Sequence, residues 1–285
     1  MNIENMPSEP KIEKITEADI RPEVPNLDET TLVLQCNIRD IRDPKSPLEM
    51  GSLLPEAAES ARLKARGFFD KIIGSLKLKE RNTIDFLIVA SDTELITPME
   101  EIKSDHKRAL ETADVVMEAL KESMAAFSIE RSQLLNRTER PVKLSSGRLQ
   151  DLKMLKDSPE FVNFLKEKYG IGKEFWIAYE DDVERETREK MEAEGPDEIS
   201  KRVDNYIRTV AKAIKLYHEK HPGRRVVVWA VSHYDAISPY IKSVIGRMKK
   251  TDYLPVDKGA GITIKVGKDL KATSTIQGNE YDFNF

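Results

Sequence analysis

A histidine and an aspartate directly follow the most apolar run of the chain. Residues 226–231 are Val-Val-Val-Trp-Ala-Val, and Ser232, His233, Tyr234 and Asp235 come next. An unbroken Val-rich run is typical of a strand covered on both faces, and the apolar spacing after Asp235 is helical. We therefore expect His233 where a central strand meets a helix, the place where ligands bind in open α/β sheets. A histidine there could also simply fill the core or cap the helix.

The sole cysteine, Cys36, is a second candidate for chemistry at the end of another aliphatic run. Residues 37–44 follow, polar and closed by proline, which indicates a loop. Cys36 and Arg42 have the Cys-x5-Arg spacing of cysteine-dependent phosphatases. However, this loop has no glycine, and Asp40 and Asp43 would repel phosphate and raise the thiol pKa. A buried cysteine without chemistry is the simpler interpretation.

The elements that must position these residues alternate along the chain. Apolar runs predict strands at 31–36, 85–91 and 226–232, with antiparallel strands at 261–266 and 273–276. Amphipathic helices are predicted after Pro55, from about Ser104 and over 198–219. This alternation favours a three-layer α/β/α sandwich with a mostly parallel central sheet.

Two regions fall outside that alternation. Residues 1–30 are rich in proline and acids, so we expect a flexible N-terminal extension before a domain of residues 31–285. Residues 125–197 combine charged helical pieces with aromatics, which suggests an inserted helical cap. The acidic run 180–182 within it is expected to be a solvated loop or helix start rather than a metal site.

Composition narrows the class and the compartment. The chain has 285 residues, 39% of them hydrophobic, which suffices for a full core. A formal net charge of −4 from nearly balanced charges gives no reason to expect nucleic acid or a membrane surface as partner. One cysteine and no apolar signal segment indicate a cytoplasmic protein. The scattered histidines show no metal-ligand spacing, so no metal or other cofactor is expected, and the oligomeric state stays open.

Four segments, taken in chain order, resemble the histidine phosphatase superfamily, in its phosphoglycerate-mutase-like branch. Residues 53–61 are similar to the family's helix opening Leu-Thr-Pro-Glu-Gly. Residues 104–113 match every fixed position of Ser-x-x-x-Arg-Ala-x-x-Thr-Ala, and residues 232–234 correspond to a strand ending Ser-His-Gly. The first strand of the family ends in Arg-His-Gly, where this chain has Gln-Cys-Asn at 35–37. The resemblance spans residues 31–276 and implies the phosphoglycerate-mutase-like fold.

In this family a histidine on the first strand attacks phosphorus, and an acid on the insertion protonates the leaving group. Two arginines and a second histidine hold the phosphoryl oxygens. The resemblance implies that Arg108 is a clamp arginine and His233 the second histidine. It places Asp151, in the segment Leu-Gln-Asp, as the proton donor. The nucleophile position is then Cys36, and the other clamp arginine is replaced by Gln35.

These replacements remove the attacking imidazole and one positive charge. A neutral glutamine cannot supply the about 1.5–3 kcal/mol of charge-assisted hydrogen bonding that an arginine gives phosphate. Loss of a covalent nucleophile costs on the order of a millionfold in rate. The resemblance thus implies a catalytically degenerate member that keeps part of a phosphate pocket, with Arg108, His233 and Arg39 or Arg42. The ligand would be a small phosphorylated molecule or an inorganic anion.

Two alternatives stay open. An active phosphomonoesterase would use Cys36 or His233 as the nucleophile and Arg108 with Arg42 as the clamp. A purely structural or interaction module would have only a vestigial pocket. Tyr234 stands where the family has a small glycine beside the second histidine, and it could crowd that pocket.

Overall fold

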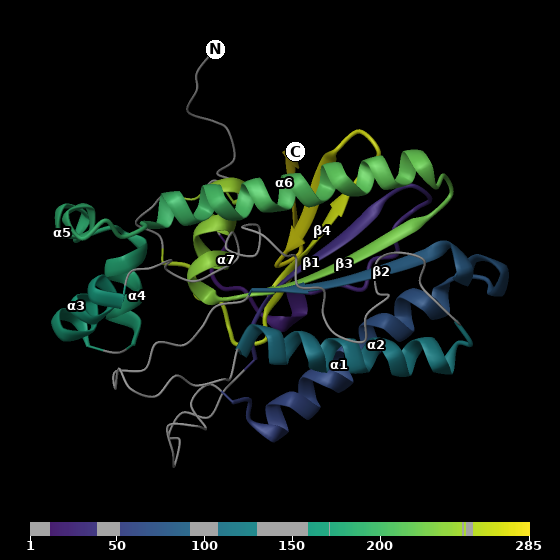
Figure 1. Cartoon of the computed structure of the whole chain (residues 1–285), viewed down its shortest axis with the longest axis horizontal. Helices are drawn as coiled ribbons and strands as arrows, with labels where there is room; N and C mark the ends of the chain where they lie inside the picture. The colour runs from purple at the N-terminus through teal and green to yellow at the C-terminus, as the bar shows by residue number, and fades with distance from the viewer. Residues whose placement is uncertain are drawn as a thin grey trace.

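The computed structural model describes residues 12–38, 52–91, 108–129, 159–170, 172–246, 248 and 253–285. Its frame is one six-stranded sheet with the order β2-β3-β1-β4-β5-β6 (Figure 1). The strands are β1 (Thr30–Cys36), β2 (Ile84–Ala90), β3 (Arg225–Ser232), β4 (Gly261–Val266), β5 (Lys271–Ile276) and β6 (Asn279–Asn284). The longer helices are α1 (Pro55–Ser75), α2 (Arg108–Ala126), α3 (Pro159–Tyr169), α4 (Lys173–Glu180), α5 (Arg185–Lys190), α6 (Pro196–Lys220) and α7 (Tyr234–Tyr240). The other helical segments are two 3-10 segments, Glu17–Asp19 and Leu78–Thr83, and a π-helical turn, Ile241–Ile245.

The sheet is mixed, which corrects the expectation of a mostly parallel one. Strand β3 pairs in parallel with both β1 and β2, whereas β4, β5 and β6 are added in antiparallel order. Helical crossovers join β1 to β2 and β2 to β3. Each crossover brings the chain back to the end of the sheet where the previous strand began, so these three strands run in the same direction. Short turns join β4 to β5 and β5 to β6, and such turns permit only antiparallel pairing.

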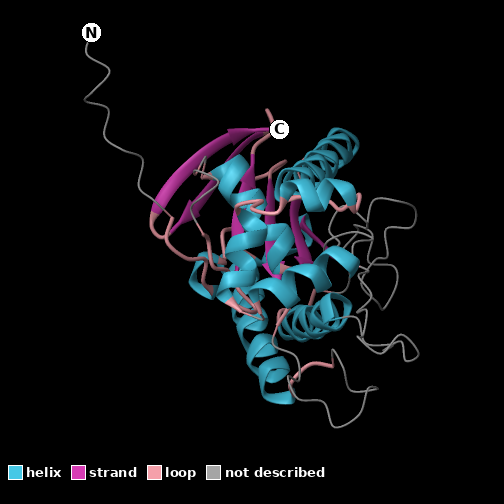
Figure 2. Ribbon diagram, turned by 90° about the vertical axis from the view of Figure 1, so that its left-hand side faces the viewer, coloured by secondary structure: helices cyan, strands magenta, loops and turns pink. Residues whose placement is uncertain are grey.

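Helices cover both faces of the sheet (Figures 1 and 2). On one face α1 and α2 pack against side chains that include Phe86 and Trp229. On the other face α6 and α7 pack against the alternate residues, among them Leu34 and Val228. All residues of β3 are buried, as expected for a strand covered on both sides. No helix in the described part of the chain is long and apolar enough to cross a membrane.

Residues 12–30 lie against the domain, contrary to the flexible extension that we expected. Ile12 and Ile15 are both buried, and Ile15 forms an isolated parallel bridge with Val256. The Ile15 N–H donates to the carbonyl of Pro255 at 2.8 Å. These contacts help to anchor the segment, although its prolines and acids give it the composition of a mobile arm. Residues 1–11 lie outside the described part.

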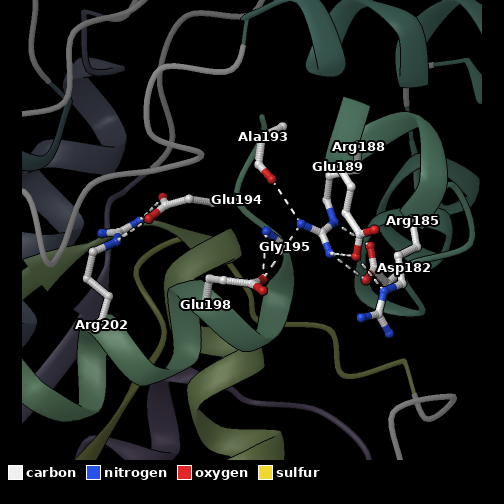
Figure 3. Close-up of polar contacts among 9 residues, drawn as sticks. All are labelled: Asp182, Arg185, Arg188, Glu189, Ala193, Glu194, Gly195, Glu198 and Arg202. Atoms are coloured by element: carbon white, nitrogen blue, oxygen red, sulfur yellow. Dashed lines mark hydrogen bonds and ion pairs between the residues drawn. The ribbon is translucent and has the colours of Figure 1, made fainter. Parts of the chain in front are cut away.

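The described part of the predicted cap, helices α3 to α5, forms a lobe beside the start of α6. Arg188 ties this lobe together, because its guanidinium donates to both oxygens of Asp182 at 2.7 and 2.9 Å and to Ala193 O at 2.9 Å (Figure 3). Arg202 of α6 donates to Glu194 at 2.7 and 3.1 Å. These ion pairs connect the lobe internally and to α6.

Candidate functional site

The ends of β1 and β3 lie level, so the residues that follow them meet at one edge of the sheet. Cys36 is the register partner of Ser232, and the Asn37 N–H donates to Ser232 O at 2.9 Å. His233 comes next and occupies the N-cap position of α7. The predicted juxtaposition of Cys36 and His233 thus follows from parallel pairing in register.

Cys36 lies at this edge as a buried thiol. Its side chain is fully buried, and its Sγ lies 3.8 Å from Asn37 Oδ1. Burial raises the pKa of the Cys36 thiol, although the positive charges of Lys258 and Arg108 act in the opposite direction. Because the thiolate is the nucleophilic form, a buried thiol with a raised pKa is inert.

His233 is buried without the contacts that a structural histidine makes. The residue is 3% exposed, and neither ring nitrogen has a hydrogen-bond partner among the described residues. Its side chain does not cap α7. Burial, followed by the positive charges of Arg108 and Lys258, lowers the pKa of His233 well below its usual value. The ring is therefore neutral near pH 7, and leaving such a buried group unpaired costs about 1–3 kcal/mol.

Arg108, the first residue of α2, is brought to the same edge by a threonine. The Thr112 hydroxyl donates to Arg108 O at 2.7 Å and accepts from the Ile38 N–H at 3.2 Å. This bridge joins the first turn of α2 to the residues after β1. It gives the threonine of the 104–113 segment a physical role: it keeps Arg108 close enough for its charge to act on Cys36 and His233.

Gln35 does not join this group. Its Nε2 donates to Gly259 O at 3.0 Å, and its Oε1 accepts from the indole N–H of Trp229 at 2.9 Å. Successive side chains of a strand point to opposite faces, so Gln35 lies on the α1 side of the sheet while Cys36 packs on the α6 side. The prediction that Gln35 contacts phosphate is therefore wrong, because its amide is held by Gly259 and Trp229 on the other face. Arg39, Arg42 and Asp151 lie outside the described residues.

Lys258 is a residue that the sequence reasoning missed. Its charge acts on both Cys36 and His233, and it lines a groove of about 850 Å³ beside the end of β1, together with Ile38. The only sequence signal is the Asp-Lys-Gly turn that precedes β4. A lysine in such a turn cannot be distinguished from an ordinary surface charge by pattern alone.

Tyr234 connects the site to the cap. Its hydroxyl donates to Glu180 Oε1, and the Ser238 hydroxyl donates to the same oxygen at 2.9 Å. Lys242 Nζ lies 2.9 Å from Glu180 Oε2. Glu180 is 2% exposed, which corrects the expectation that the acidic run is solvated. Tyr234 thus fastens the last residue of α4 to the start of α7, next to His233.

Neither a scan of protein-family models nor a search of curated proteins finds a match for the chain. Among solved structures, the chain is similar to "Mycobacterial hydrolase 2", with a TM-score of 0.45 and 12% sequence identity. The similarity covers 86% of this chain and 83% of that one. Such a distant likeness says nothing about activity, so function has to be inferred from the site itself.

Proposed function

We propose that the protein binds phosphate, or a small phosphorylated molecule, at the edge where β1 and β3 end, without transferring the phosphoryl group. The observation that carries this proposal is the buried imidazole of His233, whose ring nitrogens have no hydrogen-bond partner among the residues that the structure describes. Buried polar groups in native proteins nearly always have a partner, and exceptions need an explanation. An oxyanion that accepts the N–H of this neutral ring would supply the partner.

The charges around His233 support an anion rather than a neutral ligand. Arg108 and Lys258 both act on His233 with positive charge. A guanidinium matches the geometry of phosphate oxygens and forms charge-assisted hydrogen bonds with them. The match of residues 104–113 to the histidine phosphatase motif also supports the assignment of Arg108 as a clamp arginine. We therefore propose that the protein is a degenerate member of that superfamily.

Binding without turnover is favoured by the state of Cys36. The residue at the family's nucleophile position is a buried thiol whose pKa is raised. At neutral pH it is protonated and does not attack phosphorus. The neighbouring Gln35 directs its amide to Gly259 instead of the site, so no second clamp comes from β1.

Thermal unfolding in the presence of anions tests the proposal. Phosphate, sulfate or vanadate should stabilise the full chain, with chloride at equal ionic strength as the reference. A ligand at a hundred times its Kd adds about 2.7 kcal/mol to the unfolding free energy. This gain should vanish in Arg108→Ala and persist in Arg185→Ala, which removes an exposed arginine of the cap. A wild-type protein that none of these anions stabilises would instead be a structural or interaction module.

Hydrolysis of p-nitrophenyl phosphate separates binding from catalysis. We expect no hydrolysis above the rate of Arg108→Ala. Hydrolysis that disappears in Cys36→Ser or His233→Ala would establish the phosphomonoesterase alternative and overturn the second half of the proposal.

A further inference from the structure

A hydrogen-bonded turn carries Lys258 to the end of β1. In residues 257–260, here named the Lys258 turn, the Ala260 N–H donates to Asp257 O at 3.0 Å. Gly259 occupies the third position with φ 80°, as a type II turn requires. A side chain at that position would be strained and would also approach Glu17 Oε1 to 3.1 Å. The local geometry therefore specifies where the Lys258 backbone lies.

Backbone hydrogen bonds fasten this turn on both sides. The Cys36 N–H donates to Ala260 O at 2.7 Å, and the Gly259 N–H donates to Asn37 O at 3.1 Å. On the other side the Asp257 N–H donates to Ile15 O at 3.1 Å. The turn is thus attached to the strand end that carries the candidate site, and Lys258 Cα has little freedom.

Gln35 adds a side-chain contact to the same turn. This residue stands where the resembled family has its first clamp arginine. Its Nε2 donates to Gly259 O at 3.0 Å, and the Trp229 indole orients the amide by donating to Oε1 at 2.9 Å. Gln35 is 6% exposed, so both contacts are buried. The residue at the position of the resembled family's first clamp arginine therefore supports the turn that carries Lys258.

The ammonium of Lys258 is available for a ligand. Lys258 is exposed and has no ion pair or hydrogen bond to its side chain among the described residues. Its neighbour Asp257 pairs with Lys14 at 2.8 Å instead. Lys258 and Ile38 both line the groove, and the positive charge of Lys258 adds to the lowering of the His233 pKa and opposes the raising of the Cys36 pKa by burial.

We propose that Lys258 is the second cation of the anion site and that Gln35 is the positioning residue that holds the Lys258 turn in place. This inference rests on the proposed anion binding. The second positive charge, which the resembled family supplies from its first strand, comes here from the turn before β4. Lys258 approaches the ligand from the groove side, and Arg108 approaches it from α2.

Phosphate titration by calorimetry on the full chain tests the role of Lys258. Lys258→Ala should weaken phosphate binding by about tenfold, the loss expected for one charge-assisted hydrogen bond. Lys258→Arg should restore affinity to within about threefold, because the charge is kept. Lys212→Ala, an exposed lysine on α6, is the matched control and should bind like the wild type.

A double-mutant cycle tests the role of Gln35. Methionine is similar in shape to glutamine, and Gln35→Met removes both hydrogen bonds. It should therefore weaken phosphate binding by roughly threefold in the wild-type background. In the Lys258→Ala background the same change should have no further effect on affinity. An equal loss in both backgrounds would overturn the positioning role, since a general disturbance would not depend on Lys258.

The outcomes separate the two proposals. Wild-type affinity in Lys258→Ala, combined with lost binding in Arg108→Ala, would overturn this inference and leave the proposed function standing. A wild-type protein that binds no phosphate would overturn both.

Discussion

Two buried polar clusters lie at opposite ends of the parallel strands, and they differ in how their hydrogen bonds are satisfied. At the amino end, Asp85 is fully buried and accepts from Arg224 at 2.7 and 2.5 Å and from the Tyr217 hydroxyl at 2.9 Å. At the carboxyl end, His233 is also buried, but its ring nitrogens have no hydrogen-bond partner in the described part of the chain. The first cluster is a satisfied structural network, whereas the second leaves an unpaired group that is destabilising unless a ligand is bound.

This difference supports the proposal that a ligand binds at the carboxyl end of the parallel strands. In the sequence both residues are polar groups at one end of an apolar run, Asp85 at its start and His233 just after its end. Only their partners distinguish them. The following predictions test that distinction, beginning with the largest effect.

Asp85→Ala should lower the unfolding free energy by about 3–5 kcal/mol, because it removes the buried carboxylate that pairs with the partly buried Arg224 guanidinium. Denaturant unfolding measures the loss. Asp282→Ala on β6, an exposed position, is the control and should stay within about 0.5 kcal/mol. A loss for Asp85→Ala no larger than that of the control would mean that the amino-end cluster is not structural.

Thr112→Val should cost about 1–3 kcal/mol, because the buried Ile38 N–H loses its acceptor. It should also reduce stabilisation by phosphate, since the first turn of α2 that carries Arg108 is released from β1. Thr209→Val is a matched control: its hydroxyl makes the same bond to the carbonyl four residues earlier, but at an exposed site. Equal losses in the two variants would contradict the bridging role of Thr112.

The pH dependence of stability should report the buried neutral ring of His233. Its pKa is lowered in the folded state, so below about pH 6.5 the unfolded chain binds a proton that the folded chain does not. Stability should therefore rise with pH through this window and fall as the solution is acidified. His233 contributes at most about 1.4 kcal/mol per pH unit to this slope.

Denaturant unfolding of wild type and His233→Leu between about pH 5 and pH 8 measures that contribution. The variant should show a shallower slope. Some slope should remain from His218, whose pKa burial also lowers. Identical slopes in the two proteins would mean that His233 titrates normally.

The smallest loss of stability is expected for His233→Leu near pH 8. Leucine is apolar and similar in size, and it removes a buried ring that has no hydrogen-bond partner among the described residues, so the variant should lose no stability and should gain up to about 1–3 kcal/mol. Stabilisation by phosphate should nevertheless disappear. Denaturant unfolding of His233→Leu and Asp85→Ala should show the largest difference in unfolding free energy between the two ends of the parallel strands. Comparable losses in the two variants would contradict the interpretation that only the amino-end cluster is structural.

Local pattern predicted most of the frame. The run 226–232 became β3 and the periodic segment 198–219 became α6, each within a few residues. Strand β6 was missed, although Tyr281 and Phe283 alternate with exposed polar residues there. A two-residue turn precedes β6, with positive φ at Gln277 and Gly278, as in a tight β-hairpin. The polar composition of the strand made this hairpin hard to predict from the sequence.

The sequence by itself determined which residues end buried strands, and therefore that Cys36 and His233 share an edge. Periodicity encodes the face that each residue buries, but it carries no information about distant neighbours. Only the tertiary structure decided that Gln35 supports the Lys258 turn and that Glu180 pairs with Lys242, 62 residues away. Those contacts depend on how whole elements pack, because a side chain meets its partner only after both segments have been placed on the sheet.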